Sequence, residues 1–152
     1  MPNPGLNVLL IHAVVTAFLA GLIWTIQIVH YPLFDHVDET RFGDFHTSHS
    51  TRIGVVVGPT MAIELVSATW LLVQRPLGVA TWLTVSAFVV LGVVHATTVA
   101  ASIPSHNRLT DGFEFDAHRR LVRTNWVRTI GWSIRAVLAA VMVAEHVHAL
   151  IG

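Results

Sequence analysis

Long apolar runs separated by polar clusters dominate the pattern of this chain. Four of these runs reach the length of about 20 residues that a helix needs to cross the hydrocarbon core of a bilayer. They cover residues 6–33, 53–73, 77–103 and 124–148. Because lipid offers the backbone no hydrogen-bond partner, each run is predicted to form a transmembrane helix. We therefore expect an all-α integral membrane protein.

The polar segments between the runs predict how the helices are connected. The short link at Gln74–Pro76 makes the second and third helices antiparallel neighbours. Residues 34–52 form a polar link whose second half turns helical, and residues 104–123 form another. Asp116 is expected to cap the helix that follows the second link. No room remains for a soluble domain, so residues 1–152 are predicted to form a single antiparallel bundle of four transmembrane helices.

The arginines orient this bundle. All nine basic residues are arginines, and most of them lie in or beside the two long links, whereas Arg75 lies on the opposite side. The positive-inside rule then places both long links in the cytoplasm and both termini outside. We expect a protein of the bacterial inner (cytoplasmic) membrane, with the lipid bilayer as its main partner. No feature predicts nucleic-acid binding, and the pattern allows a homo-oligomer without requiring one.

The composition removes several kinds of chemistry. The chain has 53% hydrophobic and only 12% charged residues, and it has no cysteine. Disulfides, thiolate metal ligands and thiol redox chemistry are therefore excluded. A membrane quinone reductase that uses a pair of cysteines is excluded for the same reason.

Each predicted helix carries polar residues on one face when it is projected at 100° per residue. A polar face toward lipid would be unfavourable, so all four faces are expected to point into the bundle and form a polar interior that opens to the cytoplasm. The faces comprise Thr16, Ala20, Trp24, Gln27, His30 and Tyr31; His46, His49, Thr60, Glu64 and Ser67; Thr84, His95, Thr98 and Ser102; and Asn125, Arg128, Trp132 and Arg135.

Glu64 and Arg135 are predicted to lie at the same depth in the membrane. Each is about 16 Å from the cytoplasmic start of its helix, at a rise of 1.5 Å per residue. A buried ion pair needs good geometry to offset its desolvation, so we expect the two side chains to contact each other directly. The pair is either a structural pin between two helices or a functional group that handles protons or anchors a substrate.

Six of the ten histidines lie toward one membrane face. His46 and His49 are three residues apart and can present two imidazoles on one helical face. His30, His106 and His95 could complete a metal site from other helices. Nitrogen and oxygen ligands without sulfur suit iron, copper, zinc or manganese, and iron or copper is the expected transition metal. The alternative is a set of interfacial histidines that bond the loop backbone.

The remaining histidines have other expected roles. His12, His146 and His148 lie near the outer face and are expected to be interfacial. His36 and His118 are expected to be solvated loop residues.

Haem is an alternative cofactor. A haem in a helical bundle needs axial histidines, apolar walls and cations for its propionates. The candidates are His95 and His30 as axial ligands, Trp24, Trp126 and Trp132 as walls, and Arg119, Arg120, Arg123 and Arg128 as propionate partners.

Two segments carry a resemblance to a known family. They are Ile-Pro-Ser-His-Asn-Arg-Leu at residues 103–109 and Asn-Trp-Val-Arg-Thr at residues 125–129. In these segments the chain resembles the anthrone oxygenase-like family of small four-helix membrane proteins. The resemblance implies oxygen-dependent oxidation of an aromatic, membrane-soluble compound. It highlights His106, Asn107, Asn125 and Arg128.

A fainter resemblance involves the first two helices. Residues 21–24 (Gly-Leu-Ile-Trp) and residues 59–72, from Pro-Thr-Met to Trp-Leu-Leu, look like the corresponding helices of bacterial membrane protoporphyrinogen oxidases. This resemblance implies haem binding.

The sequence therefore favours a membrane-embedded, metal-dependent oxidoreductase of the oxygenase type. Its substrate would be a small lipid-soluble or aromatic molecule held in a polar pocket open to the cytoplasm. The alternatives are a haem-binding membrane oxidase, a non-catalytic protein that binds or transports a small solute or protons, and a structural subunit. The expected site comprises His30, His46, His49 and His106 as metal ligands, Glu64, Asn125, Arg128 and Arg135 as catalytic groups, and His95 and Trp126 beside the cofactor.

Overall fold

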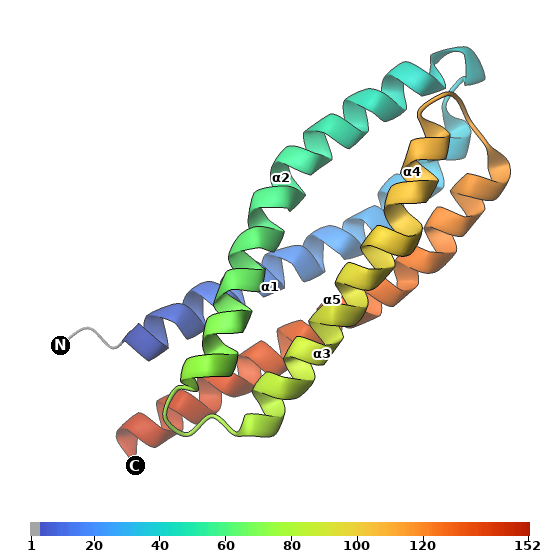
Figure 1. Ribbon diagram of the computed structural model, residues 1–152. Coiled ribbons are helices and arrows are strands. Elements are labelled where there is room, and N and C mark those ends of the chain that lie inside the picture. The colour runs from blue at the N-terminus through green and yellow to red at the C-terminus, as the bar shows by residue number, and fades with distance from the viewer. Residues whose placement is uncertain (1–3) are drawn as a thin grey trace.

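The computed structural model describes residues 4–152, which form four long helical spans (Figure 1). All four spans are long and apolar enough to cross a membrane. The first consists of α1 (Pro4–Thr25), the π-helix η1 (Ile26–His30) and the 3₁₀-helix η2 (Tyr31–His36); the second is α2 (Glu39–Gln74); the third consists of α3 (Thr81–Thr97), the π-helix η3 (Thr98–Ser102) and α4 (Ile103–Leu109); and the fourth is α5 (Phe115–Ile151).

The spans pack as a four-helix bundle. Helices α1 and α3 each contact both α2 and α5. Pro4, Gly152 and the link at residues 75–80 lie at one end of the bundle, which we call the terminal end (Figure 1). The links at residues 37–38 and 110–114 lie at the other end. We call this the histidine end, because the histidines described below gather there.

The helices extend beyond the predicted spans. The second half of the first link is helical, as expected, and α2 begins at Glu39. The carboxylate of Asp38 caps this helix by accepting a hydrogen bond from the backbone N–H of Thr40 at 2.9 Å. The expectation that Asp116 caps the fourth helix is wrong, because α5 begins at Phe115 and Glu114 occupies the N-cap position without a side-chain bond. Asp116 lies in the first turn, where its charge still favours the helix dipole.

Two π-helices explain why the first and third spans continue past prolines. Proline lacks a backbone N–H and clashes with the preceding turn, so it normally kinks or ends a helix. Here η1 ends two residues before Pro32, and η3 ends two residues before Pro104. Each wide π-turn accommodates the missing bond, and the span goes on. Such π-turns are frequent at functional sites.

Apolar side chains fill two regions of the interior. A large cluster near the histidine end includes Phe34, Phe42, Leu121 and Trp132. A smaller cluster toward the terminal end includes Leu9, Leu71, Leu83 and Met142. Large apolar residues such as Val55, Val89 and Val137 are exposed on the outside, where lipid would cover them.

Candidate functional site

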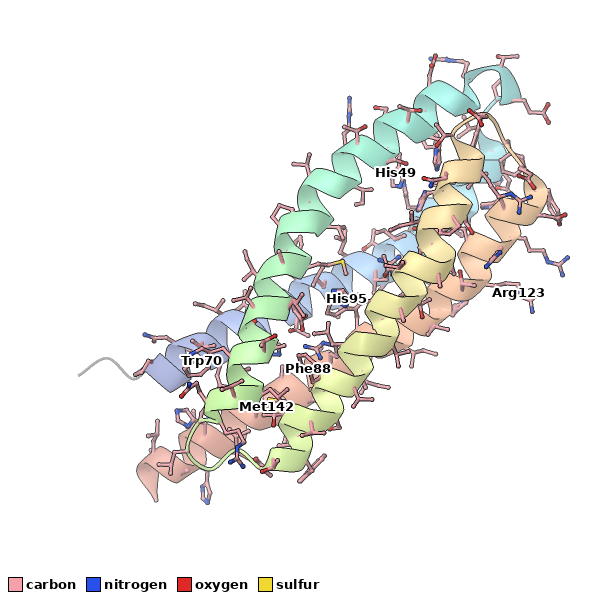
Figure 2. All side chains as sticks on the ribbon, in the orientation of Figure 1. His49, Trp70, Phe88, His95, Arg123 and Met142 are labelled. Atoms are coloured by element: carbon pink, nitrogen blue, oxygen red, sulfur yellow. The ribbon has the colours of Figure 1, made fainter. Side chains whose placement is uncertain are left out.

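Four histidines from three spans meet near the histidine end of the bundle. His30 comes from η1, His46 and His49 from α2, and His106 from α4, and we call them the histidine cluster (Figure 2 labels His49). Nε2 of His30 lies 2.7 Å from Nδ1 of His49. Nε2 of His46 lies 3.0 Å from Nδ1 of His106. The convergence that the sequence predicts for these four residues is therefore present, in the form of two hydrogen-bonded pairs.

Tyr31 joins this cluster, although the sequence interpretation gave it no chemical role. Its hydroxyl lies 3.0 Å from Nε2 of His106, and the side chain is buried. The rings of Tyr31, His106 and His46 thus form a hydrogen-bonded series across three spans. Tyr31 is the only tyrosine of the chain, and its place beside His30 on a polar helical face was the signal that could have identified it.

Aromatic side chains hold the histidine cluster in place. The ring of Phe34 packs edge-on against His46 and His49, with centroids 5.9 and 5.4 Å away. Phe42 stacks on His46 at 5.8 Å. A rigid apolar wall of this kind limits the rotamers of the imidazoles, so their mutual orientation is fixed by packing.

His118 is not the solvated loop residue that the sequence suggests. It is buried, and its Nε2 donates a hydrogen bond to the backbone carbonyl of Tyr31 at 2.8 Å. The reason is that α5 begins at Phe115, earlier than expected, so His118 lies in the first turn of a helix and faces the interior. It supports the backbone on which Tyr31 and His30 are held.

The cluster has the donor chemistry of a metal site without its assembled geometry. Two imidazole nitrogens on one tetrahedral ion would lie about 3.4 Å apart, given a metal–nitrogen distance of about 2.0–2.1 Å, whereas the two pairs have the shorter spacing of hydrogen bonds. Nδ1 of His46 is also buried without a hydrogen-bond partner. However, within residues 4–152 no group of three or more histidine and carboxylate side chains is arranged to hold a metal ion.

A groove of about 850 Å³ lies beside the cluster, between the first span and α2. His30 and His49 lie on its wall, and apolar residues such as Ile26, Val29 and Val56 line most of the rest. The sequence predicts a polar pocket in the bundle interior, open to the cytoplasm, toward which all four helices turn a polar face. This groove is instead lined by the first two spans and the residues that link them.

Charged side chains gather where the groove reaches the histidine end. Asp38, Arg41, Asp44 and Arg52 lie along this part of its lining. Hydrogen bonds from the hydroxyl and the backbone N–H of Thr40 lower the pKa of Asp38, so its carboxylate stays ionised. The groove therefore combines an apolar length with a charged mouth.

A second polar group lies behind the cluster, between the first and fourth spans. The side-chain amide of Asn125 donates to Oε1 of Gln27 at 2.8 Å. Oδ1 of Asn125 accepts from Nη1 of Arg128 at 3.0 Å. Arg128 also interacts with the side chain of Tyr31. Asn125 and Arg128, both predicted as site residues, are thus connected to His106 through Tyr31.

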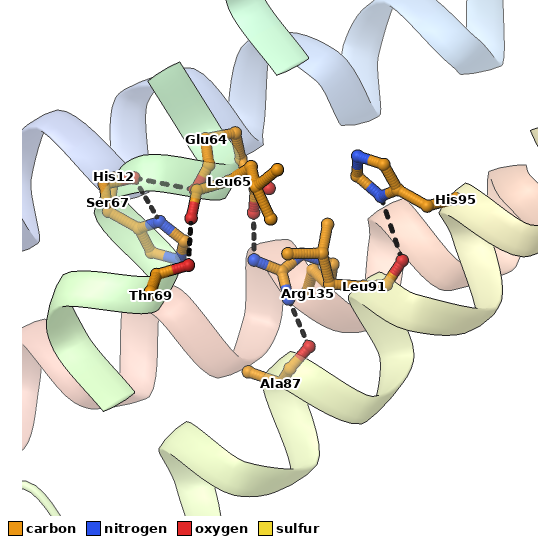
Figure 3. A network of polar contacts seen from close by, with 9 residues as sticks. All are labelled: His12, Glu64, Leu65, Ser67, Thr69, Ala87, Leu91, His95 and Arg135. Carbon is orange, nitrogen blue, oxygen red and sulfur yellow. Dashed lines mark hydrogen bonds and ion pairs between the residues drawn. The ribbon is translucent and has the colours of Figure 1, made fainter. Parts of the chain in front are cut away.

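Glu64 and Arg135 form the direct ion pair that the matched depth predicts (Figure 3). Both side chains are fully buried, and Arg135 also donates to the backbone carbonyl of Ala87. Trp132 lies against the guanidinium, with its ring centroid 5.8 Å from Cζ. The pair lies apart from the groove lining and connects α2, α3 and α5.

His12 and His146 are buried, whereas the sequence suggested interfacial positions for them. Nδ1 of His12 lies 2.9 Å from the hydroxyl of Ser67, next to Glu64 (Figure 3). Nδ1 of His146 donates to the backbone carbonyl of Leu77 at 2.8 Å. Both histidines therefore cross-link helices, which a pattern of single residues does not reveal.

The two residues expected beside a cofactor lie elsewhere. Nδ1 of His95 donates to the carbonyl of Leu91 at 3.0 Å, near the Glu64–Arg135 pair (Figure 3). Trp126 is 39% exposed and packs edge-on against Trp24 at the bundle surface. None of the four arginines predicted to bind haem propionates lines the groove. Arg119, Arg120 and Arg123 are exposed on α5, and Arg128 is buried behind Tyr31.

Comparison with protein-family models, with curated proteins and with solved structures found no match to this chain. The two resemblances seen in the sequence therefore stay predictions, and the inference of function depends on the geometry of the site.

Proposed function

We propose that this protein is a membrane-embedded enzyme that binds a lipid-soluble, amphiphilic substrate in the groove and exchanges a proton with its head group. The observation that carries this proposal is the His30–His49 pair on the groove wall. Imidazole is the side chain best suited to accept or donate a proton near neutral pH. A proton acceptor at the side of a lipid-accessible groove is what such a reaction requires.

The shape and lining of the groove support an amphiphile as the substrate. Its volume of about 850 Å³ falls within the usual range of small-molecule sites, about 300–1,000 Å³. Apolar residues of α1 and α2 would contact a ring or chain that enters from the lipid. Arg41 and Asp44 at the mouth would contact the polar end. A water-soluble metabolite would gain nothing from the apolar length.

The hydrogen bonds of the cluster support proton exchange in particular. Within each imidazole pair one ring nitrogen must carry the proton and the other must accept it. A proton taken up by His49 can therefore be shared with His30 at 2.7 Å. The ring of His106 lies 6.0 Å from that of His49, centroid to centroid, and Nε2 of His106 contacts the hydroxyl of Tyr31. Because this part of the cluster is buried, it would hold or release the proton away from the water.

The proposed placement in the membrane follows from charge. Exposed arginines of the histidine end, such as Arg41, Arg52 and Arg119, favour a cytoplasmic location for this end. The four spans would then cross the inner membrane as an antiparallel bundle with both termini outside. The charged mouth of the groove would lie at the cytoplasmic head-group level.

Adjacent valines of α2 provide a matched test of the binding site. Both side chains are exposed, but Val56 lines the groove, whereas Val55 is outside its lining. A long-chain alkyl nitrophenol serves as the probe, because its ionised form is coloured. Val56→Phe should weaken its binding to the detergent-purified protein at least tenfold, and Val55→Phe should leave binding unchanged. Equal binding by the two variants would refute the groove as the site.

The same probe tests the chemistry. The phenol bound to the unaltered protein should ionise at a different pH from free probe in the same detergent, because its hydroxyl exchanges a proton with His49. His49→Gln should keep binding and lose this His49-dependent difference. If His49→Gln ionises the probe as well as the unaltered protein does, the histidine pair has no role in proton exchange.

A metal-dependent oxidoreductase is the second candidate function. It is favoured by the convergence of four imidazoles from three spans and by Nδ1 of His46, which is buried without a hydrogen-bond partner. The residues that would hold the ion are His30, His46, His49 and His106. A bound iron or copper ion would supply electron-transfer and oxygen chemistry for substrate oxidation.

Elemental analysis decides between the two candidates. The metal candidate predicts a stoichiometric transition metal in the purified protein. It also predicts loss of that metal in His46→Ala, with full retention in His148→Ala, whose histidine is exposed at the terminal end. Metal content far below one equivalent, in protein purified without chelators, would exclude it and leave the proton-exchange proposal standing.

A further inference from the structure

Arg128 is a buried cation without a carboxylate partner. Only 7% of the surface of Arg128 is exposed. The ion pairs among residues 4–152 are Asp35–His36, Glu114–Arg108 and Glu64–Arg135, and Arg128 belongs to none of them. The other deeply buried arginine, Arg135, has Glu64. An uncompensated charge inside a membrane protein is strongly unfavourable and marks a functional site by default.

The neutral groups around Arg128 leave part of its hydrogen-bonding capacity unused. Nη1 donates to Asn125 at 3.0 Å and, weakly, to the hydroxyl of Ser102 at 3.5 Å, and the guanidinium also interacts with the side chain of Tyr31. Nε is buried without any partner. Arg135 also has an unbonded Nε, but the carboxylate of Glu64 balances its charge. Arg128 differs because it lacks such a counter-ion.

A second unsatisfied donor lies on α4. The hydroxyl of Ser105 is buried and has no hydrogen-bond partner. Ser105 follows Ser102 by three residues, so the two lie on the same helical face, one turn apart. Ser102 faces Arg128, and a ligand at the guanidinium would have serine hydroxyls along one side.

We propose that Arg128 binds a carboxylate-type anion that does not belong to this chain. The edge of a guanidinium that carries Nε binds planar carboxylates in a bidentate manner. The anion would balance the buried charge, with Asn125 orienting the guanidinium and Ser102 donating a further hydrogen bond. The carboxylate comes either from a small free anion or from the head group of an amphiphile. This site is separate from the groove and does not depend on the proton-exchange proposal.

Formate and dodecanoate are the probes, because they carry the same group with and without an apolar chain. Two measurements are made on the detergent-purified protein. One is the thermal unfolding midpoint, which rises with ligand bound to the folded state only. The other is the ¹⁹F signal of 3-fluorotyrosine, which reports Tyr31 alone because it is the only tyrosine. Both should change and saturate as the anion is added.

The variants assign the response to Arg128. Arg128→Gln should abolish both responses, whereas Arg120→Gln, which removes an exposed arginine of the same helix, should keep them. Asn125→Asp provides a folded control, since it places a carboxylate beside Nη1 and supplies an internal counter-ion. It should unfold at a higher temperature than the unaltered protein without anions, and it should no longer respond to them.

Each outcome is decisive. A response to formate identifies a small free anion as the ligand, and a response to dodecanoate alone identifies an amphiphile head group. No saturable response to either probe, or an equal response in Asn125→Asp, would overturn the proposal. Val56→Phe, which blocks the groove, should leave the formate response intact, so a failure of the groove proposal is distinguishable from a failure of this one.

Discussion

The hydroxyl of Tyr31 lies 3.0 Å from Nε2 of His106, although 75 positions separate them in the chain. Both residues follow a π-helix, and each is close to a proline: Pro32 comes after Tyr31, and Pro104 precedes His106 by two. A π-turn adds a residue to a helix and so changes which side chains face inward beyond it. The two π-helices therefore help to orient the first and third spans toward the same site.

Tyr31→Phe removes the hydroxyl that contacts His106 and Arg128 and leaves the ring in place. We expect the free energy of unfolding to fall by about 1–2 kcal/mol, because Nε2 of His106 loses its partner in a buried site. Chemical denaturation in detergent measures this change. Thr69→Val is the control, since its exposed hydroxyl bonds only the carbonyl of Leu65 within the same helix, and its effect should be small. Equal effects of the two substitutions would show that the Tyr31–His106 bond does not contribute.

The Glu64–Arg135 pair should be far more sensitive to a single change than to a double one. Glu64→Leu or Arg135→Met alone leaves an uncompensated buried charge and should cost about 3–5 kcal/mol of unfolding free energy. The double variant removes both charges and should recover most of that loss. The same denaturation experiment tests both statements. A double variant less stable than either single variant would mean that packing around the pair, rather than charge balance, dominates.

Hydrophobic pattern and depth were enough to predict the spans and the Glu64–Arg135 contact. Apolar length determines which segments can cross a membrane, and equal rise per residue places two charges at the same level. The convergence of His30, His46, His49 and His106 was predictable for the same reason. These features depend on the spacing of residues along regular helices, which the sequence contains directly.

Other features depend on details that helical spacing does not contain. Tyr31 was on the predicted polar face of the first helix, but its role was missed because its partner, His106, comes from another span. The early start of α5 at Phe115 turned His118 from an expected loop residue into a buried one. The groove arises from the way α2 packs against the first span, and no pattern within a single helix specifies that. Trp126 lies at the surface and contacts Trp24, a pairing between two spans that the pattern of one helix does not specify.

Two glycines should respond in opposite ways to alanine. A Cβ at Gly131 of α5 would lie 2.5 Å from Cγ2 of Val94, whereas a Cβ at Gly92 of α3 would meet nothing within 4 Å. Valine is stiff about χ1 and cannot easily move aside, so Gly131→Ala should destabilise the protein by about 1–3 kcal/mol. Gly92→Ala should stabilise it by about 0.5–1 kcal/mol through its helix propensity. Thermal unfolding in detergent distinguishes these outcomes, and a neutral Gly131→Ala would argue against close packing of α3 on α5.

The two imidazole pairs predict which histidines are energetically coupled. In a double-mutant cycle of His30→Ala and His49→Ala, the interaction energy should be about 0.5–3 kcal/mol, the range for residues in direct contact. A cycle of His46→Ala and His106→Ala should give a similar value, because these rings are also hydrogen-bonded. A cycle across the pairs, with His30→Ala and His106→Ala, should be close to additive at low metal concentration.

Added iron, copper or zinc should make that cross-pair coupling large if one ion joins the four rings, since each ligand would then depend on the others. Coupling within pairs that metal leaves unchanged would support hydrogen-bonded proton exchange instead, and additivity in all three cycles would contradict the arrangement of the cluster itself.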